Sequence, residues 1–375
     1  MQGAEFEQVY DFGNLYAGFL KARRGKRHKP SVAKFEANLL EALCLLSEML
    51  KTKTYRPSDY FVFKVYEPKE RIVMTNAFKD KVVQHSLCDN ILEPAFSKAF
   101  IRDNYASQSG RGTHDGLYRL EEFMRSYYFT RKANAERERR AAGLPPPGPE
   151  EVRHYSDGWV LKCDISKYFY SIQHEPLKQM TRKYIKDPDI LWLVDLIVDS
   201  TENPGIPIGN QTSQWFAVMY LSGMDHFIKK EKLGIRYYGR YMDDFYLIHE
   251  DKAYLQYCRG EIEQYVARLG LRMNKKTNIF PLRNGIDFLG FHTYLTESGK
   301  IIRKVRRSSK SNAQRKLKKQ RGLLDREKIS LSDIEQSYGS WRSHAVKGNC
   351  YHLIQKTDSL FQNLFKESEK QWPKV

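Results

Sequence analysis

The four residues Tyr241-Met242-Asp243-Asp244 decide the fold of this chain. They lie between two β-prone segments, residues 235–238 and 245–248, so they predict a hairpin with two carboxylates at its tip. Adjacent carboxylates repel each other, and a divalent cation offsets that repulsion directly. Magnesium favours hard oxygen ligands and keeps positions open for substrate phosphates. The stretch therefore indicates a metal site, with a plain acidic turn as the competing interpretation.

A further carboxylate should come from a different strand. Asp164 follows the apolar run of residues 159–163, so we expect it at the end of a buried strand over residues 160–165. Two strand ends side by side would place Asp164 next to Asp243. Two Mg²⁺ ions about 3.5–4 Å apart, held by Asp164, Asp243 and Asp244, would then stabilise the attacking and leaving oxygens of a phosphoryl transfer. Mn²⁺ could substitute for Mg²⁺.

These two segments resemble motifs of the reverse transcriptase family. Residues 241–244 resemble its catalytic core motif, and residues 161–172 resemble its first catalytic motif. The resemblance implies that Phe169 excludes the ribose 2′-hydroxyl, because a large planar ring under the sugar would clash with that group. It also implies that Ile165 lends its backbone carbonyl to a metal. Without the motif, Phe169 would be interpreted as an ordinary core residue.

The segment upstream resembles the fingers of the same family. Residues 60–65 and 71–74 predict two strands joined by the turn of residues 67–70. By the resemblance, Arg71 grips the dNTP triphosphate with its guanidinium fork; an exposed arginine at a strand end is the alternative. Residues 78–85 continue the match and place Lys81, a further dNTP contact, where an arginine is common. Residues 105–114 resemble the next fingers motif.

Residues 205–214 form a loop that precedes a predicted helix. Gly209 allows the backbone to approach a ligand closely, and Asn210 or Thr212 could cap the helix. Such a loop suits contact of Gly209 and Asn210 with the nascent base pair, and of Gln214 with the dNTP.

The same loop narrows the resemblance. Most reverse transcriptases carry Gln-Gly here and end the motif with Ser-Pro. Ile208 and Gln214 instead resemble the reverse transcriptases of diversity-generating retroelements, a bacterial lineage related to group II introns and retrons. The cDNA synthesis of those enzymes is error-prone opposite template adenines.

The segment downstream supplies the remaining contacts implied by the family. Residues 271–277 match the palm motif after the catalytic hairpin, where Lys276 would approach the leaving pyrophosphate or remain a solvated lysine. Residues 285–291 resemble the primer grip, with Gly290 in a tight hairpin. Residues 300–321 contain eleven Lys and Arg and no Asp or Glu, and would begin a basic helical thumb. The predicted phosphate contacts of this segment are Arg303, Lys304, Arg306 and Arg307.

The predicted architecture is an α+β right-hand polymerase whose palm is an antiparallel sheet backed by helices. Its parts are an N-terminal helical extension (1–58), fingers (59–158), palm (159–298) and helical thumb (299–375). Residues 131–152 are expected as an inserted exposed helix end and surface loop. Other helices are predicted over residues 31–50, 77–92 (ending before Pro94) and 254–269 (ending at Gly270).

Composition and charge agree with a nucleic-acid enzyme. The net charge of +18 over 375 residues favours an anionic partner, although basic surfaces also meet membranes. The sequence contains no apolar run long enough for a membrane span and no signal peptide. The five scattered cysteines argue against a structural zinc site and a disulfide framework. We therefore expect free, mostly buried thiols and a cytoplasmic protein, encoded by a bacterium or phage.

The predicted function is RNA-directed DNA synthesis by the reverse transcriptase of a diversity-generating retroelement. The expected partners are a template RNA, a primer or cDNA strand, dNTPs and a small basic accessory protein. An antiphage-defence or retron-like reverse transcriptase is the nearest alternative. An RNA-dependent RNA polymerase is disfavoured by Phe169, and a non-catalytic nucleic-acid-binding protein is disfavoured by the three carboxylates.

Overall fold

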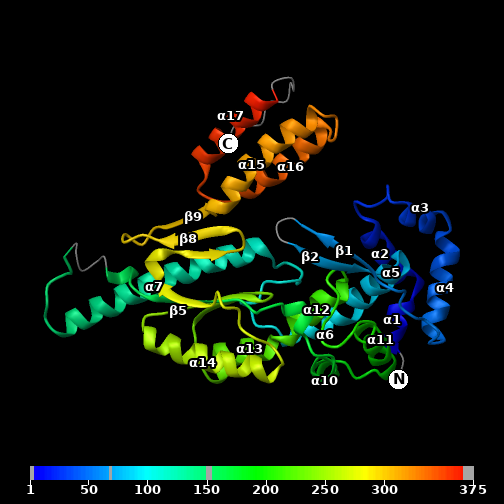
Figure 1. Cartoon of the computed structure of the whole chain (residues 1–375). Helices are drawn as coiled ribbons and strands as arrows, with labels where there is room; N and C mark the ends of the chain where they lie inside the picture. The colour runs from blue at the N-terminus through cyan, green and yellow to red at the C-terminus, as the bar shows by residue number, and fades with distance from the viewer. Residues whose placement is uncertain (1–3, 67–69, 149–153, 366–375) are drawn as a thin grey trace. The chain divides into compact units, whose positions relative to one another are not determined.

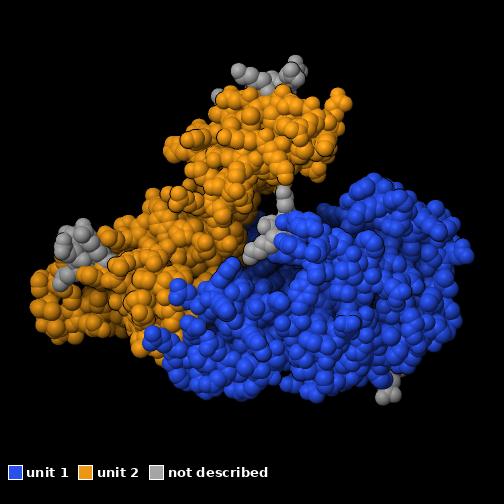
Figure 2. All heavy atoms as spheres, in the orientation of Figure 1, with its two compact units in different colours: residues 1–116, 163–246, 256–278 blue, residues 117–162, 247–255, 279–375 orange. Residues whose placement is uncertain are grey.

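The computed structural model describes residues 4–66, 70–148 and 154–365 (Figure 1). The chain divides into two compact units, which Figure 2 colours separately. Unit 1 contains residues 1–116, 163–246 and 256–278, and unit 2 contains residues 117–162, 247–255 and 279–375. Within the described residues, no helix has both the length and the apolar character needed to span a membrane.

The N-terminal helices pack on one another in unit 1. They are α1 (Ala4–Tyr10), α2 (Phe12–Arg23), α3 (Pro30–Ala37), α4 (Leu39–Lys51) and α5 (Phe78–Leu87). Gly18 of α2 is required by this packing, because a Cβ there would lie 2.7 Å from the carbonyl oxygen of Val82 in α5. The single helix predicted over residues 31–50 is wrong: the backbone leaves helical geometry at Asn38 (φ −116°, ψ 37°), which separates α3 from α4.

Helical backbone also continues past the predicted stop at Pro94. After α5, residues Cys88–Leu92 form a π-helical turn and α6 covers Glu93–Phe96. Pro94 lies in the first turn of α6, where its missing N–H has no helical partner to lose. The prediction that the helix ends before Pro94 is therefore wrong.

Three sheets are present among the described residues. Strands β1 (Phe61–Val65) and β2 (Arg71–Thr75) pair antiparallel as predicted, and residues 67–69 of the predicted turn lie outside the described residues. A four-stranded sheet has the order β4-β5-β3-β6, and a three-stranded antiparallel sheet has the order β7-β8-β9. The strands are β3 (Trp159–Cys163), β4 (Tyr237–Tyr241), β5 (Asp244–His249), β6 (Asn278–Pro281), β7 (Ile286–Phe288), β8 (Phe291–Leu295) and β9 (Ile301–Val305).

The later helices surround these sheets in the chain order. They are α7 (Thr113–Ala141), α9 (Tyr168–Ser171), α10 (His174–Tyr184), α11 (Pro188–Val198), α12 (Gln211–Tyr220), α13 (Ser222–His226), α14 (Lys252–Arg268), α15 (Arg307–Leu324), α16 (Leu331–Ala345) and α17 (Tyr351–Leu364). Helix α14 and the left-handed Gly270 (φ +74°) confirm the helix predicted over residues 254–269. Residues 131–141 are the predicted exposed helix end, and residues 149–152 of the predicted loop lie outside the described residues.

Residues 300–321 differ from the predicted uninterrupted helix. Their first part is β9, whose residues Ile301–Val305 pair with β8, and α15 begins only at Arg307. The pairing with β8 overrides the basic, helix-like composition of this segment. Four of the five cysteines are buried and all are free thiols, as predicted, with Cys44 exposed.

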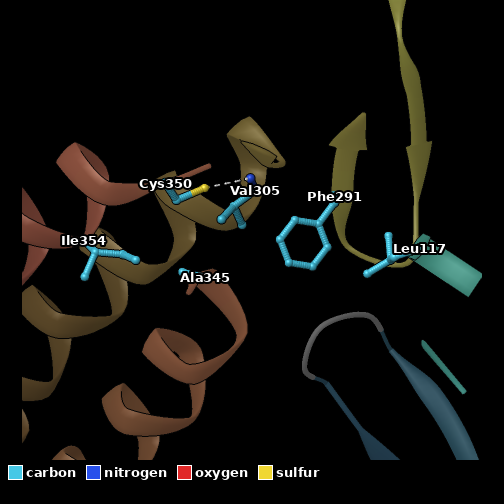
Figure 3. Close-up of a cluster of buried hydrophobic side chains, with 6 residues drawn as sticks. All are labelled: Leu117, Phe291, Val305, Ala345, Cys350 and Ile354. Carbon is cyan, nitrogen blue, oxygen red and sulfur yellow. Dashed lines mark hydrogen bonds between the residues drawn. The ribbon is translucent and has the colours of Figure 1, made fainter. Parts of the chain in front are cut away.

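The core of unit 2 joins the three-stranded sheet to the C-terminal helices. Phe291 of β8 is fully buried and packs with Leu117, Val305, Ala345, Cys350 and Ile354 (Figure 3). The Sγ of Cys350 accepts a hydrogen bond from the backbone N–H of Val305 at 3.3 Å, so the start of α17 is tied to the end of β9. Helices α15, α16 and α17 share a second core around Leu317, Tyr338 and Phe361.

Candidate active site

The hairpin between β4 and β5 turns through two residues. Strand β4 ends at Tyr241 and β5 begins at Asp244, so Met242 and Asp243 make the connection. Met242 is buried and has a left-handed backbone (φ +56°). A non-glycine residue rarely adopts this conformation, because its Cβ crowds the following carbonyl. The surrounding structure must therefore hold the turn in place.

Arg240 supplies that support from beneath the turn. Its side chain is completely buried, as is that of its partner Asp225 on α13. The guanidinium Nε and Nη2 donate to the two Asp225 oxygens at 2.6 Å each. Its Nη1 donates to the carbonyl oxygen of Met242 at 2.9 Å. The same side chain thus binds a buried carboxylate and fixes the residue before Asp243.

The Asp225 carboxylate is satisfied by further buried donors. The Tyr238 hydroxyl donates to Oδ1 at 2.5 Å, and the Asn104 amide donates to Oδ2 at 3.3 Å. Burial and then the Asp225 charge raise the pKa of Tyr238 well above its ordinary value. Burial lowers the pKa of Arg240, but the Asp225 charge outweighs burial and holds it above its ordinary value. The ion pair therefore stays charged and fully hydrogen-bonded inside the core.

The turn brings Asp243 to Asp164. Burial raises the pKa of Asp243 to about 6, and the charge of Asp164 together with a hydrogen bond to it raises it further. The positive charge of Arg71 acts in the opposite direction, so Arg71 also lies within electrostatic range. Two carboxyl groups in contact repel each other when both are ionised, and a bound cation relieves that repulsion. This arrangement is the one expected of a cation site.

Asp164 is held by a second segment of backbone. The amide N–H of Asn274 donates to the Asp164 carbonyl at 2.7 Å, and the Asn274 side-chain amide donates to Asp164 Oδ2 at 2.8 Å. Ile165 forms a β-bridge with Met273. Sequence reasoning missed Asn274, although it lies within the recognised segment 271–277. Its role depends on the pairing of residues 164–166 with 272–274, which a single sequence does not reveal.

The third predicted ligand lies next to this pair in the chain. Asp244 is the first residue of β5 and is half-buried. In the ranges that the structure describes, no set of three His, Cys, Asp or Glu side chains is arranged as a ready metal cage. The facing carboxyls of Asp164 and Asp243 nevertheless offer the hard oxygen donors that Mg²⁺ prefers.

The residues predicted to bind the dNTP lie on several elements of unit 1. Arg71 is the exposed first residue of β2, opposite Val65. Lys81 of α5 donates to the Thr75 hydroxyl, and burial, followed by the charge of Lys26, lowers its pKa. Gln214 is half-buried on α12.

Phe169 and Lys276 occupy positions of different exposure. Phe169 is half-buried on α9, with its ring 5.8 Å from that of Tyr168. Lys276 is exposed, and its backbone N–H donates to the Asn274 side chain at 3.0 Å.

The loop before α12 packs directly on β2. The N–H of Met74 donates to the carbonyl of Ile208 at 3.0 Å, and a Cβ on Gly209 (φ +135°) would lie 2.5 Å from the Met74 carbonyl. Only glycine fits there. The predicted caps are wrong: Asn210 has the N-cap position without a side-chain cap bond, because its amide donates instead to the Tyr60 hydroxyl at 2.8 Å. The hydroxyl of Thr212 has no hydrogen-bond partner.

The predicted nucleic-acid residues of unit 2 fall into two groups. Leu289 (φ +49°) and Gly290 (φ +89°) form the two-residue turn between β7 and β8, a conformation typical of tight hairpins. Lys304 and Arg307 are exposed, and Arg306 is half-buried.

Arg303 faces the other way. It is 8% exposed, lies 3.3 Å from a Glu121 carboxylate oxygen, and stacks its guanidinium over the Tyr118 and Phe291 rings. Its predicted phosphate contact would have to be made from this buried position.

Comparison with known proteins identifies the family. The model of the family described as reverse transcriptase (RNA-dependent DNA polymerase) matches residues 66–293. The chain therefore belongs to the reverse transcriptase family, a family of nucleotidyltransferases. Membership and the observed antiparallel sheets confirm the predicted right-hand polymerase fold class.

Individual relatives are distant. The chain is 24% identical to Protein YkfC of Escherichia coli (strain K12) over 317 residues, which cover 70% of this chain and 75% of YkfC. Telomerase from Candida albicans in complex with the TWJ fragment of telomeric RNA is 12% identical, with a TM-score of 0.47. Apo telomerase from Candida Tropicalis is also 12% identical, with a TM-score of 0.46. The matches cover 86% and 82% of this chain but only 58% and 60% of the two telomerase chains.

Replacing Asp225 by Asn would leave the Arg240 guanidinium buried opposite a neutral amide. We expect the free energy of unfolding to fall by about 3–5 kcal/mol, because removing one partner leaves an uncompensated buried charge. Urea denaturation followed by circular dichroism measures this loss. As a control, Glu263→Gln removes a charge from the exposed Arg259–Glu263 pair and should cost roughly 0–1 kcal/mol. Equal stability of the two variants would contradict the assigned role of Arg240.

Proposed function

We propose that this chain copies an RNA template into DNA by metal-assisted nucleotidyl transfer. The contact between the Asp164 and Asp243 carboxyls carries this proposal. Membership of the reverse transcriptase family supports the reaction class. The raised pKa of Asp243, caused first by burial and then by Asp164, supports a cation as the natural partner of the pair.

In the proposed reaction, the primer 3′-hydroxyl attacks the α-phosphate of a dNTP. The new bond joins the primer oxygen to that phosphorus, and the bond to the β-phosphate oxygen breaks to release pyrophosphate. Asp164, Asp243 and Asp244 would hold two Mg²⁺ ions, with the Ile165 carbonyl as a further ligand. The ions would supply Lewis-acid stabilisation of the attacking and leaving oxygens.

The protein side chains would then orient the substrate. Arg71 lies near enough to Asp243 to lower its pKa, so its guanidinium would bind the triphosphate beside the carboxylates. Lys81 and Lys276 would add positive charge for the phosphates. Phe169 would exclude the 2′-hydroxyl, and Gln214 would contact the dNTP.

The nucleic-acid strands would contact both units. In unit 1, the side-chain Oδ1 of Asn210 is buried without a hydrogen-bond partner, so an acceptor is left for the nascent base pair, and Gly209 lets the backbone come close. In unit 2, the turn at Gly290 would meet the primer, while Lys304, Arg306 and Arg307 would bind phosphates without reading sequence. Arg303 would contribute to phosphate binding only if its pairing with Glu121 opened.

The more specific role we propose is that of a diversity-generating retroelement reverse transcriptase. Ile208 and Gln214 support it through their place in the loop that packs on β2. The enzyme would work in the cytoplasm of a bacterium on a template-repeat RNA, together with a small basic accessory protein. An antiphage-defence or retron-like enzyme would use the same catalytic site, so the errors in its product, rather than its chemistry, separate the two roles.

Asp243→Asn should abolish primer extension. Losing one ligand of the metal pair removes several kcal/mol of transition-state stabilisation, so we expect the rate to fall by about three orders of magnitude. The assay is extension of a DNA primer annealed to a defined RNA, with Mg²⁺ and dNTPs. The exposed Asp59 provides a control of equal charge change, since Asp59→Asn should extend at the wild-type rate. An active Asp243→Asn enzyme would rule out the mechanism.

Phe169→Ala should relax the choice of sugar. Removing the ring removes the clash with the 2′-hydroxyl, and we expect the ratio of rNTP to dNTP incorporation to rise by about tenfold or more. The measurement compares kcat/KM for matched rNTP and dNTP on one template. Phe129→Ala, which truncates an aromatic ring that is 53% exposed, should leave the ratio unchanged. An unaltered ratio in Phe169→Ala would show that another residue discriminates the sugar.

Sequencing the cDNA should reveal substitutions clustered opposite template adenines. This pattern is expected from the proposed retroelement role and not from faithful copying. A matched template in which guanine replaces adenine at the same positions is the control and should yield few substitutions there. Errors spread evenly over the four template bases would contradict the retroelement role and leave the polymerase activity standing.

A further inference from the structure

We propose that a pocket in unit 2 binds one unpaired nucleotide of a single-stranded RNA. The pocket has a volume of about 910 Å³ and lies where the β7-β8-β9 sheet meets the first turns of α15 and α17. This volume falls in the upper part of the range typical of ligand pockets. The inference rests on the proposed function, which supplies the RNA, but the pocket contains none of the catalytic carboxylates.

The pocket uses the solvent-facing side of the three-stranded sheet. Side chains alternate between the two faces of a strand, so the cross-strand partners Asp287, His292 and Lys304 share one face. All three line the pocket. Phe291 and Val305 point to the opposite face, although the backbone of Val305 also reaches the pocket floor beside Cys350 (Figure 3). The sheet thus has a packed side and a side available for a ligand.

The charges on the pocket wall are predominantly positive. Lys304, Arg306, Arg307 and Lys310 contribute four cations. The carboxylate of Asp287 is the opposing charge, and it is already engaged by His292 at 2.7 Å and by Arg306 Nε at 3.6 Å. Such a surplus in a concave site attracts phosphate groups.

Two helices begin at the pocket, which strengthens its attraction for anions. The N-cap residues of α15 and α17, Arg306 and Cys350, make no side-chain capping hydrogen bond. The first N–H groups of a helix lack intrahelical acceptors, and the helix dipole is positive at that end. Phosphate oxygens would satisfy these donors.

Aromatic rings add a feature that phosphate alone does not need. Tyr351 and His352 line the pocket from the first turn of α17, and their ring centroids lie 5.4 Å apart at an interplanar angle of 75°. The Tyr351 ring is 48% exposed, and its hydroxyl accepts a hydrogen bond from Gln355 at 2.8 Å, which orients it. An exposed, oriented ring beside cations is the arrangement that stacks an unpaired base and holds its phosphates.

The chemistry therefore selects a single-stranded segment over a duplex. Bases inside a duplex are already stacked and paired, so they do not enter a pocket of this size, whereas bases in RNA loops and ends can be splayed out onto aromatic side chains. The natural occupant would be an unpaired part of the template RNA outside the primer-paired region.

The test measures binding of a fluorescein-labelled single-stranded RNA of about 12 nucleotides by anisotropy. Lys310→Ala/Tyr351→Ala removes one cation and one ring, and we expect the affinity to fall by about tenfold and the salt dependence to weaken by about one ion. A 4-thiouridine RNA should crosslink to residues 349–353. The matched control Lys34→Ala/Tyr257→Ala removes the same groups from exposed positions on α3 and α14 and should bind as wild type; Tyr257 is 48% exposed, like Tyr351.

Several outcomes would overturn the inference. These are equal affinity of the pocket variant and wild type, crosslinks found only outside the pocket, equal loss in the control variant, and equal binding of an abasic ribose-phosphate oligomer. Equal binding of a DNA oligomer would overturn the choice of RNA. Thermal melting checks that each variant is folded. Primer extension by the wild-type enzyme on a pre-annealed template is scored separately, so failure of the proposed polymerase activity is distinguishable from failure of the pocket.

Discussion

The buried ion pair between Arg240 and Asp225 is the interaction on which the catalytic turn depends. A guanidinium removed from water is tolerated only when a carboxylate and further hydrogen bonds replace the lost solvation. Asp225, Val218 and Met242 together supply these partners. Because one of the partners is the Met242 carbonyl, the requirement to satisfy a buried charge also keeps the left-handed turn that presents Asp243.

The second half of the site is held by an independent constraint. Asp164 leaves β3 and is bound through both its carbonyl and its carboxylate by Asn274. The two carboxyls therefore approach each other from separately anchored segments, and neither can retreat to relieve their repulsion. Burial together with this proximity raises the pKa of Asp243 to about 6. Such an arrangement stores electrostatic strain that a cation would relieve, which is the physical link between the core of the protein and the proposed chemistry.

Unit 2 shows how one strand can serve two surfaces. Along β9, Arg303 and Val305 face the packed side of the sheet, while Lys304 faces the pocket. A run of basic residues that is uniform in sequence is therefore divided in space. Arg303 pairs with Glu121 and stacks on rings, whereas Lys304 remains exposed. Positive charge alone does not say which of these residues can reach a phosphate.

The sequence by itself determined the features that depend on local pattern. It indicated the hairpin around Asp243, the strand before Asp164 and the glycine turn at Gly290, because alternation, turn residues and motif spacing are short-range properties. Only the tertiary structure decided what depends on partners distant in the chain. It buried Arg240 against Asp225, placed Asn274 on Asp164, paired residues 301–305 with β8, and directed the Asn210 amide to Tyr60 instead of the helix end. Burial and cross-strand pairing are set by the whole fold, and they override the local preferences from which those residues were first interpreted.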